Sequence, residues 1–276
     1  MALSLDGPLV LAGAGKMGGA LLAGWLKRGL DPRLVVVQDP GPPGEVAQLL
    51  KDNAIQSSTS AANALEVAPA VIVVAVKPQA MEAVFPDLAK LAGPDTLILS
   101  IAAGKPLASF EKHLPQGTPV IRAMPNTPAA IGRGITVCVG NAHVMEAQRV
   151  LATSLLEAVG EVGWVDEESA MDAVTALSGS GPAYVFLLAE AMAAAGERQG
   201  LAPELAARLA RATVAGAGEL LHLSGESAGQ LRQNVTSPGG TTAAALSVLM
   251  REGSGFAELM AEAIAAATKR GRELAG

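Results

Sequence analysis

The sequence predicts two domains, a doubly wound α/β domain built on a parallel sheet and then an all-α domain. Short β-branched runs separated by helical patterns fill the first part of the chain, and this alternation is typical of βαβ units. From about Asp166 onward the pattern changes to long periodic segments rich in Ala and Leu, which indicate helices. The predicted domains are therefore residues 1–164 and 165–276.

The individual elements follow from the same patterns. The expected strands are PLVLA at 8–12, LVVV at 34–37, VIVVAV at 71–76, LILSI at 97–101, VIRA at 120–123, ITVCV at 135–139 and EVGWV at 161–165. The expected helices include MGGALLAGWLKRG at 17–29, PAYVFLLAEAMAAAGERQG at 182–200, PELAARLARATVAGAGELLHL at 203–223 and FAELMAEAIAAATKRGREL at 256–274. Pro182 and Pro203 begin two of these helices, because proline suits the first helical turn.

Composition narrows the classes of function. The formal net charge is −6, from 20 basic and 26 acidic residues, and no long basic run offers a surface for nucleic acid. Cys138 is the only cysteine, so a disulfide within the chain and a cysteine-based metal cluster are excluded. Its apolar surroundings predict a buried thiol. No apolar run approaches the roughly 20 residues of a membrane span. We expect a soluble cytoplasmic protein that binds neither nucleic acid nor membranes, and we expect no metal site.

The first loop carries a glycine pattern. VLAGAGKMG places Gly13, Gly15 and Gly18 in the spacing G-x-G-x-x-G, directly after the first strand and at the start of a helical pattern. In this setting the first glycine permits a tight turn, the second lets the backbone approach a pyrophosphate, and the third lets the helix pack closely on the strand. The pattern predicts a Rossmann-type site for a dinucleotide.

Asp39 ends the second strand, about twenty residues beyond the glycines, where an acidic side chain bonds the ribose 2′-hydroxyl and repels a 2′-phosphate. This position favours NADH over NADPH. Asp before Pro and Gly is equally common at the start of a turn, and Asp39 precedes Pro40 and Gly41. The residues leave both roles open, and with them the choice between the two cofactors.

Three more loops follow strands at the carboxyl edge of the predicted sheet, where ligands bind in open α/β sheets. They are AVKPQ at 75–79, SIAAG at 100–104 and MPNTP at 124–128. Lys77 brings the only charge of the first loop, and the small residues and the Asn of the other two suit contact with a nicotinamide. Each loop would also suit an ordinary turn, but their convergence on one edge favours a binding site.

The segment TSPGGTT, residues 236–242, stands among helical patterns. A hydroxyl side chain that caps a helix, with proline and glycines in a turn, would explain it. A row of backbone N–H groups at a helix start that binds an anion would explain it equally well. For Thr242 the alternatives are a helix cap and a hydrogen bond to a ligand.

The segment SGSGP, residues 178–182, is interpreted as a hinge where helices or subunits approach closely, with direct substrate contact as the alternative.

Five segments together resemble the pyrroline-5-carboxylate reductase family, in the family's order and over roughly residues 8 to 272: GAGKMG, AVKPQ, RAMPNTPAAIGRG, DAVTALSGSGPAYVF and NVTSPGGTTAAAL. The resemblance implies a Rossmann domain that binds NADPH or NADH and a helical dimerisation domain. It implies reduction of the cyclic imine L-1-pyrroline-5-carboxylate to L-proline, the last step of proline biosynthesis. A homodimer within a larger homo-oligomer is also implied.

The resemblance assigns roles to residues of this chain. The implied cofactor contacts are Gly13, Gly15, Lys16, Met17, Gly18, Asn63, Ala75, Val76, Lys77, Pro78, Ala102, Ala103, Asn126 and Asn234. The implied substrate contacts are Val235, Gly239, Gly240, Thr241 and Thr242, with Thr242 as the catalytic residue. Asp39 departs from the family, where many relatives have Ser, Asn or Arg suited to a 2′-phosphate, so NADPH preference does not transfer.

Two other functions fit parts of the sequence. A β-hydroxyacid dehydrogenase shares the order of domains, but such enzymes use a lysine of the helical domain for acid–base chemistry, and no lysine occurs between Lys112 and Lys269. A catalytically silent dinucleotide sensor would keep the Rossmann domain and use the helices to bind a partner. Such a sensor has no need of an anion-binding turn such as TSPGGTT.

Overall fold

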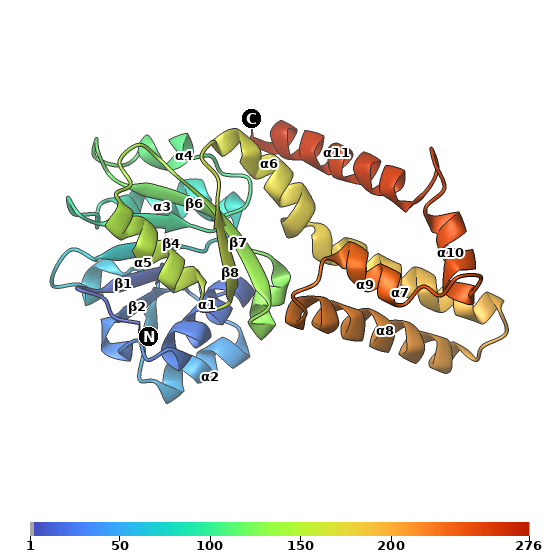
Figure 1. Cartoon of the computed structure of the whole chain (residues 1–276). Helices are drawn as coiled ribbons and strands as arrows, with labels where there is room; N and C mark the ends of the chain where they lie inside the picture. Colours follow the sequence, from blue (N-terminus) through green and yellow to red (C-terminus); the bar gives the residue numbers. More distant parts are fainter. Residues whose placement is uncertain (1–2, 276) are drawn as a thin grey trace. The chain divides into compact units, whose positions relative to one another are not determined.

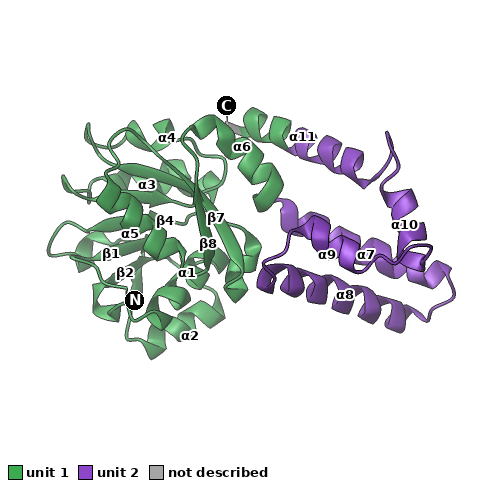
Figure 2. Cartoon of the chain, in the orientation of Figure 1, with its two compact units in different colours: residues 1–179, 268–276 green, residues 180–267 purple. Residues whose placement is uncertain are grey.

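The computed structural model describes residues 3–275 and divides the chain into two compact units. One unit holds residues 1–179 and 268–276, and the other holds residues 180–267 (Figure 2). Our predicted boundary lay between residues 164 and 165. In the structure, residues 165–179 belong to the α/β unit, where Met171 is buried in the core beside the sheet.

The α/β unit is built on one eight-stranded sheet with the strand order β3-β2-β1-β4-β5-β6-β7-β8 (Figure 1). The strands are β1 (Leu9–Ala12), β2 (Val35–Gln38), β3 (Ser57–Ser58), β4 (Val71–Val74), β5 (Leu97–Ser100), β6 (Val120–Met124), β7 (Gly134–Gly140) and β8 (Gly160–Trp164). The predicted strands are all present. β3 was not predicted, because two polar residues give no apolar signal.

The sheet is parallel from β3 to β6, but β7 runs antiparallel to β6, and β8 is parallel to β7. The predicted parallel sheet is therefore found from β3 to β6, and the pairing of β6 with β7 departs from it. The connection between β6 and β7, residues 125–133, is shorter than the dozen or so residues that a parallel crossover needs. The chain must therefore reverse its direction there.

Helices cover both faces of the sheet. They are α1 (Lys16–Lys27), α2 (Gly44–Asp52), α3 (Met81–Ala89), α4 (Ala108–Glu111), α5 (Glu146–Leu156) and α6 (Met171–Val174). Alternate residues of each strand point to opposite faces, so Leu11 packs with Leu21 and Leu155 on one face while Ile72 packs with Phe85 on the other. Trp25 joins α1 to α5 by donating its Nε1–H to the Leu155 carbonyl at 2.8 Å.

The other unit is helical. Its helices are α7 (Gly181–Arg198), α8 (Pro203–Leu223), α9 (Ala228–Asn234), α10 (Thr241–Leu249) and the first part of α11 (Phe256–Ala275). Pro182 and Pro203 lie in the first turns of α7 and α8, as predicted. Among its described residues, the buried apolar side chains are only Ala206 and Ala210. This unit by itself encloses almost no core.

The first glycine of SGSGP ends one helical run, and Ser180 is the N-cap of the next, α7. A π-helix, Thr175–Gly179, follows α6 directly and leads into α7. Gly179 allows a close approach, since a Cβ added there would lie 2.5 Å from Met124 Cε. The two units divide after Gly179, within the segment that we interpreted as a hinge, and the hinge stays a prediction.

Two expectations from composition can be compared with the structure. Cys138 is buried, as predicted, and burial raises the pKa of its thiol to about 12, with a smaller opposing effect from Arg149. No helix within residues 3–275 is long and apolar enough to cross a membrane.

Candidate active site

The glycine loop between β1 and α1 has the backbone that a pyrophosphate site needs. Gly13 has φ +92°, and a Cβ there would lie 2.6 Å from the Ala75 carbonyl oxygen. A Cβ on Gly18 would meet the Gly13 carbonyl oxygen, so only glycine lets α1 start so close to β1. Gly15 is the N-cap of α1, no side chain caps it, and the space around its Cα is open. The first N–H groups of a helix have no partner within the helix, so a phosphate can bind them.

Lys16 and Met17 form the first helical positions of this loop. Lys16 is exposed, whereas Met17 packs against the core beneath α1. Their backbone N–H groups belong to the open end of the helix. The structure therefore supports a backbone role for both residues at an anion site.

Asp39 lies beside this loop at the end of β2. Its Oδ2 accepts the Ala14 N–H at 2.7 Å, and its Oδ1 accepts the Gly41 N–H at 2.8 Å. The bond to Gly41 shows that Asp39 begins a turn, which was one of the two roles that the sequence left open. The bond to Ala14 joins the carboxylate to the glycine loop, so a single side chain fixes both segments and stays half-exposed at the predicted ribose position.

The loops that follow β3 and β4 lie on either side of the glycine loop in the sheet order. Asn63 lies in the short 3-10 turn η2 (Ala62–Ala64), which is held near β2 because Ala61 N–H donates to Gln38 Oε1 at 2.9 Å. Ala75 N–H donates to the Ala12 carbonyl at 2.7 Å, which brings the segment Ala75–Pro78 against the glycine loop. Val76 and Pro78 are half-buried there, and Lys77 is exposed.

The loops after β5 and β6 continue the same edge. Ala102 is buried and donates its N–H to Ser100 Oγ at 3.2 Å, while Ala103 is exposed. Asn126 begins the 3-10 turn η4 (Thr127–Ile131), and its Oδ1 accepts the Ile135 N–H at 3.0 Å. The structure thus brings the predicted cofactor residues of the α/β unit to one edge of the sheet, in the order in which the loops follow the strands.

In the helical unit, TSPGGTT forms a tight turn and then a helix start. Gly240 N–H donates to the Ser237 carbonyl at 3.0 Å, and Gly239 has φ +69°, which are features of a type II turn with Pro238 at its second position. Gly240 is the N-cap of α10, and no side chain caps the helix. Thr242, the second residue of α10, is therefore not a helix cap. The Gly240 N–H is bonded to the Ser237 carbonyl in the single chain, and its contact with a ligand anion stays a prediction.

Asn234 and Val235 precede this turn. The Asn234 side chain donates to Glu226 Oε2 at 3.0 Å and accepts from Gln230 Nε2 at 2.8 Å. Val235 is the C-cap of α9 and is 65 % exposed. The Asn234 amide is thus engaged by its own segment in the single chain.

One pair near the site was not anticipated. Arg122 of β6 is buried and donates from Nη1 to Glu168 Oε1 at 2.8 Å. The sequence did contain a signal, because Arg122 is the only charged residue of the buried run VIRAM and a buried charge requires a partner. The identity of that partner, 46 residues further along the chain, was not evident.

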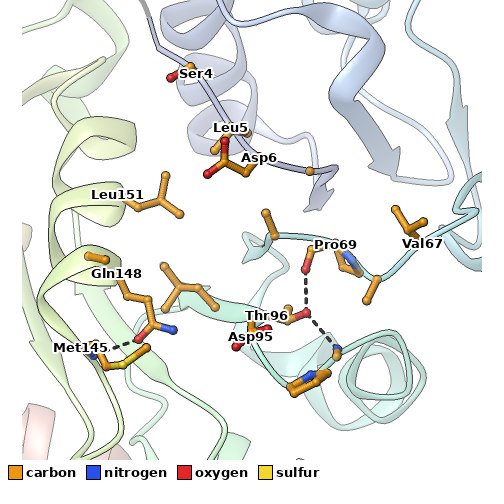
Figure 3. Close-up of a pocket in the computed structure, with 17 residues that line it drawn as sticks. Ser4, Leu5, Asp6, Val67, Pro69, Asp95, Thr96, Met145, Gln148 and Leu151 are labelled. Carbon is orange, nitrogen blue, oxygen red and sulfur yellow. Dashed lines mark hydrogen bonds between the residues drawn. The ribbon is translucent and has the colours of Figure 1, made fainter.

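A pocket of about 670 Å³ lies away from these loops, at the amino ends of β1, β4 and β5 (Figure 3). In it Thr96 Oγ donates to the Pro69 carbonyl at 2.6 Å and accepts the Gly93 N–H at 2.9 Å. Gln148 Oε1 accepts the Met145 N–H at 2.9 Å. No predicted site residue lines this pocket, so it is separate from the candidate active site.

Comparison with known proteins identifies the family. A pyrroline-5-carboxylate reductase from Pseudomonas aeruginosa is 44 % identical over 267 residues, which cover 97 % of this chain and 96 % of the relative. The chain belongs to the pyrroline-5-carboxylate reductase family. The model of the pyrroline-5-carboxylate reductase dimerisation domain matches residues 168–274. A second model, described as NADP oxidoreductase coenzyme F420-dependent, matches residues 9–104.

Solved reductase structures share the whole fold. A pyrroline-5-carboxylate reductase from Coxiella burnetii, 34 % identical, covers 98 % of this chain and 99 % of its own, with a TM-score of 0.89. A Plasmodium falciparum pyrroline carboxylate reductase with NADP bound is 27 % identical, covers 98 % of this chain and 99 % of its own, and has a TM-score of 0.79. The predicted fold class, a Rossmann-type domain followed by a helical dimerisation domain, is confirmed.

Proposed function

We propose that this reductase converts L-1-pyrroline-5-carboxylate to L-proline with NADPH or NADH, as the last step of proline biosynthesis. The near full-length match to reductases of that name carries the proposal. We also propose the cytoplasm as the place of the reaction, since the reduced dinucleotide that it consumes belongs to cell metabolism.

The residues of the α/β unit fit a dinucleotide. The open space at Gly15 and the free end of α1 accommodate a pyrophosphate, Asp39 lies where a ribose is bound, and the small residues Ala102 and Ala103 leave room at the next loops. Reduced nicotinamide bound at this edge supplies the hydride. The protein's task is to hold the imine carbon against it and to exclude water.

The substrate carboxylate requires an anion site, and the start of α10 provides one. The helix N-terminus carries a partial positive charge, and the turn leaves the Gly239 and Thr241 N–H groups for a ligand, since the Gly240 N–H is bonded to Ser237. Glycine at 239 lets a ligand approach the backbone closely. We propose that these two groups bind the carboxylate, with Val235 beside it.

Thr242 is the proposed catalytic residue. The residue is half-buried and follows the N-cap by two positions, so it lies in the first turn of the helix, where the molecule would be held. A hydroxyl both donates and accepts hydrogen bonds, so it can stabilise the proton on the ring nitrogen. Because the protonated imine already attracts hydride, no stronger acid is needed, and the remaining rate enhancement comes from orientation.

The helical unit completes its core with a second copy. Phe186 and Leu187 of α7 are 64 % and 63 % exposed in the single chain. Apolar residues of α8 and α11 are exposed as well. A surface this apolar marks a protein interface, in agreement with the dimerisation model that matches it. We propose a homodimer, assembled further into a larger homo-oligomer.

The two alternative functions have less support. No lysine occurs between Lys112 and Lys269 to serve as the acid–base residue of a β-hydroxyacid dehydrogenase. The helix Thr241–Leu249 begins without a capping side chain, which suits an anion site. A silent sensor would have no use for such a site.

The decisive experiment measures loss of nicotinamide absorbance when pyrroline-5-carboxylate is added to the purified dimer with NADPH or with NADH. Rapid oxidation with formation of proline is expected with at least one cofactor. If neither is oxidised although both bind, the protein is a sensor or acts on another substrate.

The role of Thr242 is tested by Thr242→Ala. We expect kcat to fall by roughly 30-fold, about 2 kcal/mol of transition-state stabilisation, with unchanged cofactor affinity. Ser247→Ala removes a hydroxyl from the same helix, where Ser247 Oγ donates to the Ala244 carbonyl, and serves as the control. A Thr242→Ala enzyme as fast as its parent would remove Thr242 from the mechanism.

A further inference from the structure

Arg122 is a buried charge in the strand that leads to the candidate active site. It lies on β6, two residues before Met124 and four before Asn126. Its side chain is 7 % exposed, and that of Glu168 is 31 % exposed. In register, Arg122 lies opposite Ser100 of β5 and Val139 of β7. The guanidinium therefore projects from one face of a strand that has a neighbour on each side, and it has little access to water.

Glu168 bonds two segments with one oxygen. Oε1 accepts Arg122 Nη1–H at 2.8 Å and also accepts the Leu107 N–H at 2.8 Å. Leu107 closes the loop that starts at Ser100 and contains Ala102 and Ala103. A single carboxylate thus joins the end of the β5 loop to the strand that ends beside Asn126.

The segment that begins at Glu168 contacts β6 near both of its ends, at Glu168 and at Gly179. Arg122 and Met124 lie on one face because strand residues two apart share a face. Glu168 bonds Arg122, Met171 is 1 % exposed in the core on that side, and Gly179 packs against Met124. The π-helix lies at the end of this segment, and single π turns occur frequently at functional sites.

A buried ion pair is an inefficient way to stabilise a fold. Removing two charges from water costs about as much as their attraction returns, and apolar residues of similar volume often replace such a pair without loss of stability. The ion pair does give fixed directions, since charge-assisted hydrogen bonds are short and strongly oriented. Its value at this place lies in geometry, because both loops that it joins are proposed to face the nicotinamide.

We propose that Arg122 and Glu168 form a positioning pair for the reductase reaction: together they fix the loop at Ala102–Ala103 and the segment 168–179 relative to Asn126, and so set the distance and angle of hydride transfer. This inference rests on the proposed function for the identity of the reaction. Neither residue is assigned contact with substrate or cofactor.

The test compares variants that separate geometry from stability. The double variant Arg122→Met/Glu168→Leu replaces the pair by apolar side chains. Glu168→Asp retains the charge and shortens the side chain by one methylene group, so it preserves the folded unit. Glu157→Gln is the matched control, since Glu157 pairs with Arg28 at 3.6 Å elsewhere in the same unit. For each purified dimer, thermal unfolding, ADP-ribose affinity, fluorescence of bound NADH, kcat and KM are measured.

We expect the double variant to unfold a few degrees below the parent, because the Leu107 N–H loses its acceptor. It should bind ADP-ribose within about twofold of the parent, because the glycine loop is unchanged. Its kcat should fall by about 30-fold and that of Glu168→Asp by about 5-fold, since displacements near 1 Å at a reacting centre are costly. NADH fluorescence should change in both variants, while KM for the imine changes little. The control should match the parent in every measurement.

A kcat and an NADH fluorescence equal to the parent's in Glu168→Asp, or in a folded double variant, would overturn the proposal and leave the pair a purely structural contact. A uniform loss of ADP-ribose affinity together with kcat would overturn it as well, because that pattern indicates general damage to the unit. Failure of the parent to reduce pyrroline-5-carboxylate would refute the proposed function instead, and the fluorescence comparison would still decide the role of the pair.

Discussion

The α/β unit and the helical unit differ in how much of their apolar surface they bury. The α/β unit buries large side chains such as Trp25, Phe85 and Phe110 completely on both faces of its sheet. The helical unit leaves Phe186, Leu187 and Leu259 largely exposed and buries only alanine side chains among its described residues. The first unit has a core of its own, whereas the second exposes apolar surface that we propose a second copy covers. Cofactor binding should therefore depend on the first unit, and turnover on the assembled pair.

The largest expected effect comes from Phe186→Asp in the helical unit. Burial of a phenylalanine side chain contributes about 1.5–3 kcal/mol, and the variant places a charge on the interface of each copy. We expect dissociation into monomers and a loss of activity on the order of 100-fold, which light scattering and the absorbance assay measure.

Val150→Asp is the control for this change, because Val150 is 56 % exposed in the α/β unit. It should leave both mass and activity unchanged. A Phe186→Asp protein that remains an active dimer would show that α7 does not form the interface.

The next largest effect is expected at the glycine loop. Gly15→Val should fold, because nothing lies within 4 Å of its added Cβ, but its side chain occupies the space for the pyrophosphate. We expect the Kd for NADH to rise by about 30-fold, or about 2 kcal/mol, without change in the dimer mass. Calorimetry checks the affinity.

Gly18→Val provides the contrast, since its Cβ would overlap the Gly13 carbonyl. This variant should fail to fold. Cofactor affinity that is unaltered in Gly15→Val would mean that the dinucleotide binds elsewhere.

A smaller effect is expected from Asp39→Ser, which tests cofactor preference. The change removes a negative charge near the proposed ribose position and should raise the ratio of NADPH to NADH efficiency by about tenfold, or 1.4 kcal/mol. Asp31→Ser is the control, because Asp31 pairs with Arg33 on the surface. If the ratio of kcat/KM values does not change, Asp39 has only the structural role of bonding the glycine loop and the turn at Gly41.

The smallest effect concerns Cys138. Its folded-state pKa is raised to about 12, so the folded protein retains a proton that the unfolded chain loses above about pH 8.5. Stability that is present below this pH should decline as the pH rises, by about 1 kcal/mol between pH 8 and 9.5. Denaturant unfolding of the parent should show this decline and Cys138→Ala should not. Equal declines in both proteins would attribute it to other groups.

The sequence was most informative where a short range of residues decides the structure. Strand β4 and the glycine loop were predicted because β-branched runs and glycine spacing act locally. The reversal at β7 was missed, although the short connection after β6 contained the signal. The bond between Gly240 and Ser237 was missed because it depends on the turn type.

Long-range relations were beyond sequence reasoning. Glu168 is one acidic residue among several in DEES, and only the folded sheet brings it to Arg122. Asn126 was predicted to be a site residue, but its bond to the Ile135 N–H depends on the direction of β7. Residue types were therefore easier to predict than their partners.

The chain leaves the α/β unit after Gly179 and returns to it at Thr268, where Gly271 lies against Asp172. The helical unit is thus a loop held at both ends by one folded body. Chain held in this way gains less freedom on melting than a free tail would, because the entropy of a closed loop grows only with the logarithm of its length. A monomer released by dilution should therefore keep the helices of this unit close to their dimer conformation. Reassembly of the dimer should then start from a restrained segment and not from an open coil.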